Sequence, residues 1–338
     1  MPLAKLVRLG TFHTGLWLVL LACLIITVML PHNPYIRYQA MSGTIFERVR
    51  WTYERIHFDD TPIDIAFIGS SRTARGVISP DLESQLADLG HNVNIVNFSI
   101  PASGFDVRLA LALELLAEKQ PELLVISVVE QFPRHGHKAF GELASTGELL
   151  ASPWIVNRNL PGNLARLPMR QITLALASWM PAAFGYNEEF VFEAYAGTSV
   201  DPRIFNPGKT DGPKTSDDIA ALDRESRFRR GDITRQVLPA TLAWLEFGIP
   251  RTYLRRIAEL AATNGTQIVF LYLPFYGGFS EPFERAWLEQ YGPVLTAEFL
   301  LNNPNLYNDV AHASELGAAR ITDWLAVALT RLLKQPKD

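Results

Sequence analysis

Short apolar runs alternate with amphipathic stretches along most of this chain. Four runs rich in Ile, Val and Leu are predicted to be buried strands: 63–68, 93–97, 123–129 and 267–273. Stretches with apolar residues at helical spacing lie between and after them: 79–89, 105–119, 251–262, 282–291 and 314–332. Strands that alternate with helices pair in parallel through right-handed crossovers, so the pattern predicts an α/β fold with a parallel sheet of about five strands.

The alternation stops after the third predicted strand, and residues 131–249 form what we interpret as a long insertion. Ten of the 22 prolines lie between 131 and 250, and the apolar periodicity there is patchy. Two stretches are compatible with helices: 164–179 and 237–247. Insertions at the carboxyl edge of a sheet commonly shape specificity. The core is then formed by residues 62–130 and 250–338.

The N-terminus carries a long apolar run. Lys5 and Arg8 precede residues 15–30, which are apolar but for one threonine. With the flanking residues the run reaches about 20 residues, the length that spans a bilayer as a helix. We therefore predict that residues 1–33 are a cytoplasmic tail and a transmembrane helix, and that the rest of the chain is exported. A cleaved signal peptide is the alternative.

The next segment, 34–61, mixes aromatic, basic and apolar side chains, among them Tyr35, Trp51 and Arg55. It is predicted to be a juxtamembrane helix or linker. Two interpretations stay open: a helix at the bilayer interface with its aromatic rings at headgroup level, or a helix that packs on the domain.

Composition and charge exclude several classes of function. The chain is 48% hydrophobic and 20% charged with a net charge of -4, so it can form a sizeable core and has no bulk electrostatic case for binding nucleic acid. The single cysteine, Cys23, allows neither a disulfide framework nor a cysteine-based zinc site. Gly-x-Gly-x-x-Gly, phosphate-loop and Gly-x-Ser-x-Gly motifs are absent, and no metal or cofactor is predicted.

The candidate chemistry comes from two short motifs near opposite ends of the chain. Gly69-Ser70-Ser71 follows the first predicted strand, so it places a hydroxyl at the carboxyl edge of the sheet, where ligands bind in open α/β folds. Asp309-Val310-Ala311-His312 stands just before the last predicted helix. An aspartate can orient the imidazole, and the imidazole can take the proton of a serine that is otherwise a weak nucleophile.

These two motifs resemble the first and last sequence blocks of the SGNH/GDSL hydrolase superfamily. The resemblance aligns Ser71 with the nucleophile, His312 with the general base and Asp309 with its orienting carboxylate; Ser70 is the fallback nucleophile if the turn is shifted by one residue. It implies a three-layer, flavodoxin-like fold. It covers roughly residues 62–132 and 250–333, and not the insertion.

The two middle blocks of the superfamily are altered in this chain. The second block carries an oxyanion glycine, but Ala102 stands in that register and Gly104 follows two positions later. The third block supplies an asparagine, and here Val129-Glu130-Gln131 takes its place. The expected oxyanion-binding residues are therefore Ser71, Ala102, Gly104 and Gln131.

The anchor, the Ser-Ser-Arg-Thr sequence and the long insertion look most like the envelope branch of the superfamily, which includes alginate O-acetylation proteins and the protein that D-alanylates teichoic acids. This implies a serine esterase or O-acyltransferase with a Ser-His-Asp acyl-enzyme mechanism. It would be anchored in the bacterial inner membrane with a periplasmic domain and act on a carbohydrate acceptor or acyl ester, with a multi-spanning membrane acyltransferase as a partner. The alternative is a catalytically silent module that binds polysaccharide or scaffolds an envelope acylation or export complex.

Overall fold

A parallel β-sheet organises the protein. The computed structural model describes residues 3–102, 104–155, 157–205, 214–233 and 236–333, with side chains from residue 14 onward. The sheet has five strands in the order β2-β1-β3-β4-β5. Their bounds are β1 Ile65–Ile68, β2 Ile95–Asn97, β3 Leu123–Val128, β4 Gln267–Tyr272 and β5 Val294–Thr296. All four strand pairings are parallel, which confirms the predicted α/β fold.

Alternate residues of each central strand pack into different hydrophobic layers. In β1, Ile65 and Phe67 belong to one cluster of buried side chains, and Ala66 and Ile68 belong to the other. All six residues of β3 are buried, as expected for a strand covered on both faces. This double burial explains why the sequence reads as continuous apolar runs at these positions.

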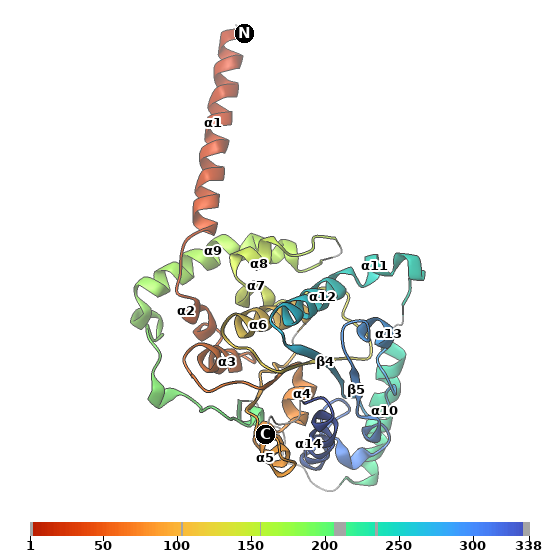
Figure 1. Ribbon diagram of the computed structural model, residues 1–338. Helices are drawn as coiled ribbons and strands as arrows, with labels where there is room; N and C mark the ends of the chain where they lie inside the picture. Colours follow the sequence, from red (N-terminus) through yellow and green to blue (C-terminus); the bar gives the residue numbers. More distant parts are fainter. Residues whose placement is uncertain (1–2, 103, 156, 206–213, 234–235, 334–338) are drawn as a thin grey trace.

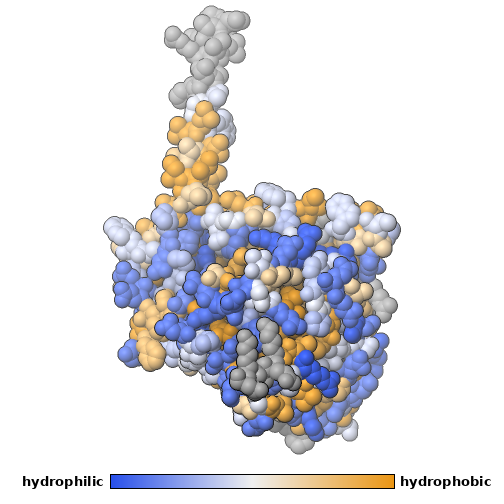
Figure 2. Space-filling model, in the orientation of Figure 1, coloured by the Kyte–Doolittle hydropathy of each residue, from blue (hydrophilic) through white to orange (hydrophobic). Residues whose placement is uncertain are grey.

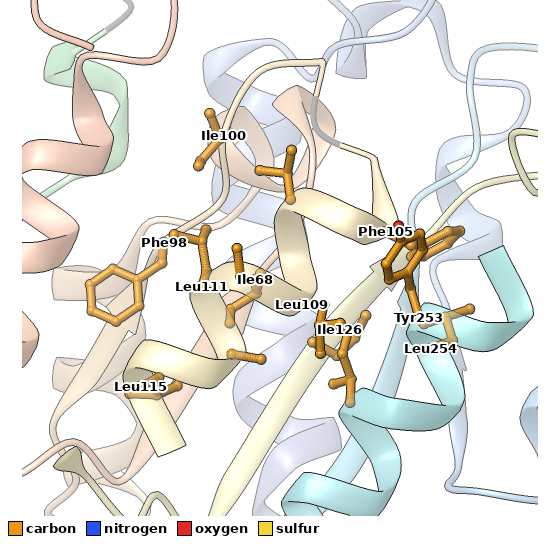
Figure 3. Close-up of a cluster of buried hydrophobic side chains, with 14 of the residues drawn as sticks. Ile68, Phe98, Ile100, Phe105, Leu109, Leu111, Leu115, Ile126, Tyr253 and Leu254 are labelled. Atoms are coloured by element: carbon orange, nitrogen blue, oxygen red, sulfur yellow. The ribbon is translucent and has the colours of Figure 1, made fainter. Parts of the chain in front are cut away.

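Helices cover both faces of the sheet (Figure 1). On one face lie α5 (Ser79–Asp88) and α14 (Glu315–Thr330), whose apolar residues share a cluster with Phe67 and Val125. On the other lie α3 (Arg48–His57), α6 (Phe105–Glu118) and α12 (Gly248–Thr263). Figure 3 shows α6 at the centre of this second layer, with Leu109 beside Ile126 of β3.

The N-terminal helix α1 (Leu3–Val28) includes most of the predicted apolar helix and projects from the body (Figure 1). The predicted membrane span, however, is not found: in the parts of the chain given above, no helix is both long and apolar enough to cross a membrane.

The segment that follows α1 packs on the domain, the second of the two interpretations left open. It forms α2 (Pro34–Gln39) and α3, and Tyr35 and Trp51 are buried against the core. Arg55 is fully buried and donates hydrogen bonds to the carbonyls of Thr61 and Pro62, which hold the chain at the entrance to β1.

The insertion between β3 and β4 wraps around the core and does not form a separate body. Its helices are α7 (Phe140–Leu143), α8 (Thr146–Leu150), α9 (Leu160–Trp179), α10 (Ser216–Asp232) and α11 (Ala243–Glu246). Short 3-10 helices occupy Pro181–Phe184, Phe192–Ala194, Pro202–Phe205 and Ala240–Leu242, and later Glu298–Leu300 and Pro304–Leu306. Helix α9 matches the predicted 164–179, whereas α10 and β5 had no corresponding prediction. The helix predicted over 282–291 is only α13 (Arg285–Leu288).

The close approach of α14 to the preceding loop gives a stability prediction. A Cβ atom at Gly317 would lie 2.0 Å from the Leu306 carbonyl oxygen, a backbone atom that cannot move aside cheaply. We expect Gly317→Ala to lower the free energy of unfolding by about 1–3 kcal/mol, measured by urea denaturation. Gly231→Ala in α10 is the matched control, since a Cβ there meets nothing within 4 Å. Unchanged stability of Gly317→Ala would contradict this close packing.

Candidate active site

The turn after β1 presents Ser71 at the carboxyl edge of the sheet. A Cβ at Gly69 would lie 2.4 Å from the Ser127 hydroxyl oxygen of β3, so only glycine fits here. The Ser70 N–H donates to the same oxygen at 3.2 Å. Helix α4 (Ser71–Gly76) begins directly afterwards, and Ser71 is half-buried. Because β1 pairs with β2 on one side and β3 on the other, this turn lies where the connections diverge, the usual ligand crevice of such sheets.

The loop before α14 is closed by its own hydrogen bonds. Ser314 caps the helix by accepting the Gly317 N–H at 3.0 Å, and its hydroxyl donates to the Asn305 carbonyl at 2.7 Å. Within the loop, the Asn308 N–H donates to the His312 carbonyl at 2.9 Å. These bonds fix the position of the loop that carries His312 relative to α14.

The two motifs meet in one hydrogen-bonded chain. The His312 Nε2 atom lies 2.8 Å from the Ser71 Oγ atom, although the two residues are 241 positions apart. The His312 Nδ1 atom lies 2.9 Å from both carboxylate oxygens of Asp309. Because a carboxylate only accepts, the ring proton belongs on Nδ1, and Nε2 is left to accept the serine proton. The structure therefore brings together the three residues predicted as a triad.

The Asp309 carboxylate is held in its ionised form. Burial alone would raise its pKa, but hydrogen bonds from the His312 ring and from the backbone N–H groups of Ala311 and His312 lower the pKa to about 2. It is therefore negatively charged at neutral pH and able to stabilise a protonated imidazole.

Ser70, the fallback nucleophile, has a different position. It is the N-cap residue of α4, and its side chain makes no capping hydrogen bond. The hydroxyl that donates to His312 Nε2 is that of Ser71, one residue further along.

The predicted oxyanion residues Ala102, Gly104 and Gln131 line one cavity of about 470 Å³. The loop that carries the first two is tied to the serine turn, because the Ile100 N–H donates to the Gly69 carbonyl at 2.9 Å. The Gln131 side-chain nitrogen Nε2 is buried and has no hydrogen-bond partner among the described residues. Ser71 is not among the residues that line this cavity.

Ala102 adopts a backbone conformation that favours glycine. Its φ is 52°, and it is the one described residue other than glycine with a positive φ. This is the position where the superfamily pattern expects glycine. An alanine in this left-handed conformation is less stable by about 1 kcal/mol, because its Cβ atom crowds the following carbonyl oxygen.

The space around Gly104 leaves no room for a side chain, since a Cβ atom there would lie 2.5 Å from an Asp106 carboxylate oxygen. Asp106 accepts the backbone N–H groups of Val107 and His137 and thereby joins α6 to the loop after β3. Burial raises the pKa of this carboxyl to about 7, although these hydrogen bonds oppose the shift.

A buried ion pair beside the triad was not predicted from the sequence. Arg72, next to the serine, donates to both carboxylate oxygens of Glu130 and to the Leu273 carbonyl at 3.0 Å. Burial opposes ionisation of Glu130, but the Arg72 guanidinium holds the pKa of that carboxyl below its usual value. The pair links the loops after β1, β3 and β4. The adjacent motif contained Arg72, but nothing in the sequence identifies its partner.

Helix α10 of the insertion packs over the same loops. Lys214, just before the helix, donates to the Asn308 carbonyl at 2.9 Å, and Arg230 donates to the Gly277 carbonyl at 3.0 Å. Arg229 lies over the Phe275 ring at 5.1 Å, whereas Arg224 and Arg227 are exposed. Arg235, a further arginine of this segment, lies outside the described residues.

Compared with protein-family models and with curated proteins, the chain matches none. Within the described ranges, no group of three or more His, Cys, Asp or Glu side chains is arranged to hold a metal ion.

The Arg72–Glu130 pair gives a second stability prediction. We expect Glu130→Gln to lower the free energy of unfolding by about 3–5 kcal/mol, because it leaves Arg72 buried without a counter-charge. The double variant Arg72→Met/Glu130→Gln should recover part of that loss, since it removes the uncompensated charge. Urea denaturation of both variants is the measurement, and a double variant less stable than Glu130→Gln would contradict the pairing.

Proposed function

We propose that this protein is a serine-dependent ester hydrolase or O-acyltransferase of the SGNH type. The observation that carries the proposal is the continuous Ser71–His312–Asp309 hydrogen-bonded chain, with heavy-atom distances of 2.8 and 2.9 Å. This geometry is what a serine hydroxyl needs to act as a nucleophile at neutral pH.

In the proposed reaction, Ser71 Oγ attacks the acyl carbonyl carbon while its proton passes to His312 Nε2. Asp309 stabilises the imidazolium that forms. Collapse of the tetrahedral intermediate breaks the ester bond, and the leaving alcohol takes the proton from Nε2. Water or an acceptor hydroxyl then gives a proton to His312 Nε2 and attacks the acyl carbonyl carbon. Collapse of this second tetrahedral intermediate breaks the bond between the acyl carbon and Ser71 Oγ, which takes the proton back from Nε2 as the acid or the new ester is released.

The developing oxyanion needs donors opposite the nucleophile. The Ser71 backbone N–H at the start of α4, the backbone between Ala102 and Gly104, and the Gln131 amide are the groups we assign to this role. The unpartnered Nε2 of Gln131 supports the last assignment, since a buried donor without a partner is costly unless a ligand uses it.

The strand order β2-β1-β3-β4-β5 supports the flavodoxin-like part of the resemblance, because it is the order of that doubly wound class. By the same resemblance we propose an acyl ester on a cell-envelope polysaccharide as the substrate and a location outside the cytoplasm, with a membrane acyltransferase as a partner. The insertion between β3 and β4 places α10 over the loops around the proposed triad. This position supports a role for the insertion in shaping a binding site for the acceptor.

Replacement of the nucleophile is the direct test. We expect Ser71→Ala to abolish hydrolysis of p-nitrophenyl acetate above background, because the variant has no hydroxyl to form the acyl-enzyme. Ser70→Ala is the matched control and should keep most of the activity, since its hydroxyl is not bonded to His312. Equal turnover by wild type and Ser71→Ala would reject the assignment and favour a catalytically silent binding module.

The oxyanion assignment has its own test. We expect Gln131→Ala to lower kcat about 100- to 1,000-fold with little change in KM, because the lost donor acts mainly in the transition state. Gln236→Ala is the control, as this amide does not line the cavity of Ala102 and Gly104 and already donates to the Leu238 carbonyl. A change in KM alone would assign Gln131 to ground-state binding instead.

A further inference from the structure

Helix α9 lies in a segment with an unusual charge distribution. Residues 149–187 contain no Asp or Glu and three arginines, Arg158, Arg166 and Arg170. The segment forms the surface of the body next to α1 (Figure 1). This segment therefore has a formal charge of +3 in a chain whose net charge is -4.

The outer side of α9 is apolar. Met169, Ile172, Leu176 and Trp179 follow each other at helical spacing, and Met169 and Trp179 are 67% and 77% exposed. We call these four residues the α9 stripe. In an ordinary surface helix these positions would be polar, because the opposite side of α9 is already buried in the body.

Helix α1, which also has exposed apolar side chains, is in contact with α9. The Val28 carbonyl, at the end of α1, accepts a hydrogen bond from the Gln171 side chain at 3.0 Å, so the two helices are joined at this point. Leu24 and Ile25 of α1 are about half exposed. Figure 2 shows the apolar residues along the described part of α1 and at places on the adjoining face of the body.

Beside α9 is a cavity of about 430 Å³ lined by four cationic side chains, Arg37, Lys138, Arg166 and Arg170, and by one carboxylate, Glu142. We call it the basic cavity. Leu174 and Met41 contribute apolar surface to its lining.

The basic cavity contains more buried donors than the protein itself uses. Arg170 is only 9% exposed, and its Nε and Nη2 atoms have no partner among the described residues. The same holds for Nε of Arg37, which is 5% exposed. Burial and the neighbouring Arg37 together lower the pKa of Arg170 to about 10, whereas Arg37 itself forms an ion pair with Glu114 at 3.2 Å. An anion between them would supply the missing acceptors and relieve the repulsion.

We propose that the basic cavity binds the phosphate of an anionic phospholipid whose acyl chains lie along the α9 stripe. The phosphate offers bidentate acceptors to Arg170 and Arg37, with Arg166 and Lys138 at the rim. A free phosphate would use the same donors, but it would leave the α9 stripe and the exposed side chains of α1 in water. The inference is independent of the triad and of the proposed ester chemistry.

The test measures binding to the full chain in a non-ionic detergent by isothermal titration calorimetry. The probes are a short-chain phosphatidylglycerol, the matching phosphatidylcholine and inorganic phosphate. Phosphatidylglycerol should bind most tightly. Arg170→Met should weaken that binding about 10- to 100-fold, because it removes charge-assisted hydrogen bonds at nearly constant volume. Arg166→Gln, at an exposed position, should weaken it about fivefold.

Two control variants separate the parts of the proposal. Arg158→Gln changes an exposed arginine of the same acid-free segment that does not line the cavity, so it should bind phosphatidylglycerol as the wild type does. The double variant Leu176→Ser/Trp179→Ser should weaken the binding of phosphatidylglycerol but not the binding of inorganic phosphate. Equal affinity for phosphate and phosphatidylglycerol would overturn the lipid assignment, and equal affinity for phosphatidylcholine would overturn the requirement for an anion. If Arg158→Gln and Arg166→Gln weakened phosphatidylglycerol binding equally, the assignment of the phosphate to the basic cavity would be overturned.

Discussion

The candidate site depends on how α14 packs against the sheet. Ile321, Leu325 and Leu329 of this helix share a buried cluster with Phe67 of β1, so the C-terminal helix is fixed beside the strand that leads to Ser71. The cap at Ser314 and the closed loop before it transmit that position to His312. Apolar packing of α14 therefore sets the distance between His312 Nε2 and Ser71 Oγ. The hydrogen bond between them is a consequence of that packing.

The strands predicted from the sequence agree with the structure to within about two residues, since β1, β3 and β4 are buried on both faces and leave continuous apolar runs. The resemblance selected Ser71, Asp309 and His312, and the fold brings them into contact. Their chemistry remains a prediction that the geometry supports. The membrane span assigned to the N-terminal run was not found in the described residues.

The features that were not predicted from the sequence have weak local signals. Helix α10 has little apolar periodicity and is held by polar contacts such as Tyr276 to Asp223 at 2.9 Å. Strand β5 has only one buried residue, Val294, and follows Gly292-Pro293, so it leaves no continuous apolar run. The Arg72–Glu130 pair and the basic cavity join residues from distant segments, so no window of sequence contains them.

Because the molecule is layered, the N-terminal side and the side that carries the candidate site have different surroundings. Helix α9 packs on α7, α7 packs on α6, and the sheet separates α6 from α14. Figure 1 accordingly has α1 and α14 on opposite sides of the body. A bilayer at α9 would hold His312 away from the lipid headgroups by most of the thickness of the domain. The protein would then act as a spacer, and its serine would meet polymer chains that extend outward from a surface in preference to esters buried within it.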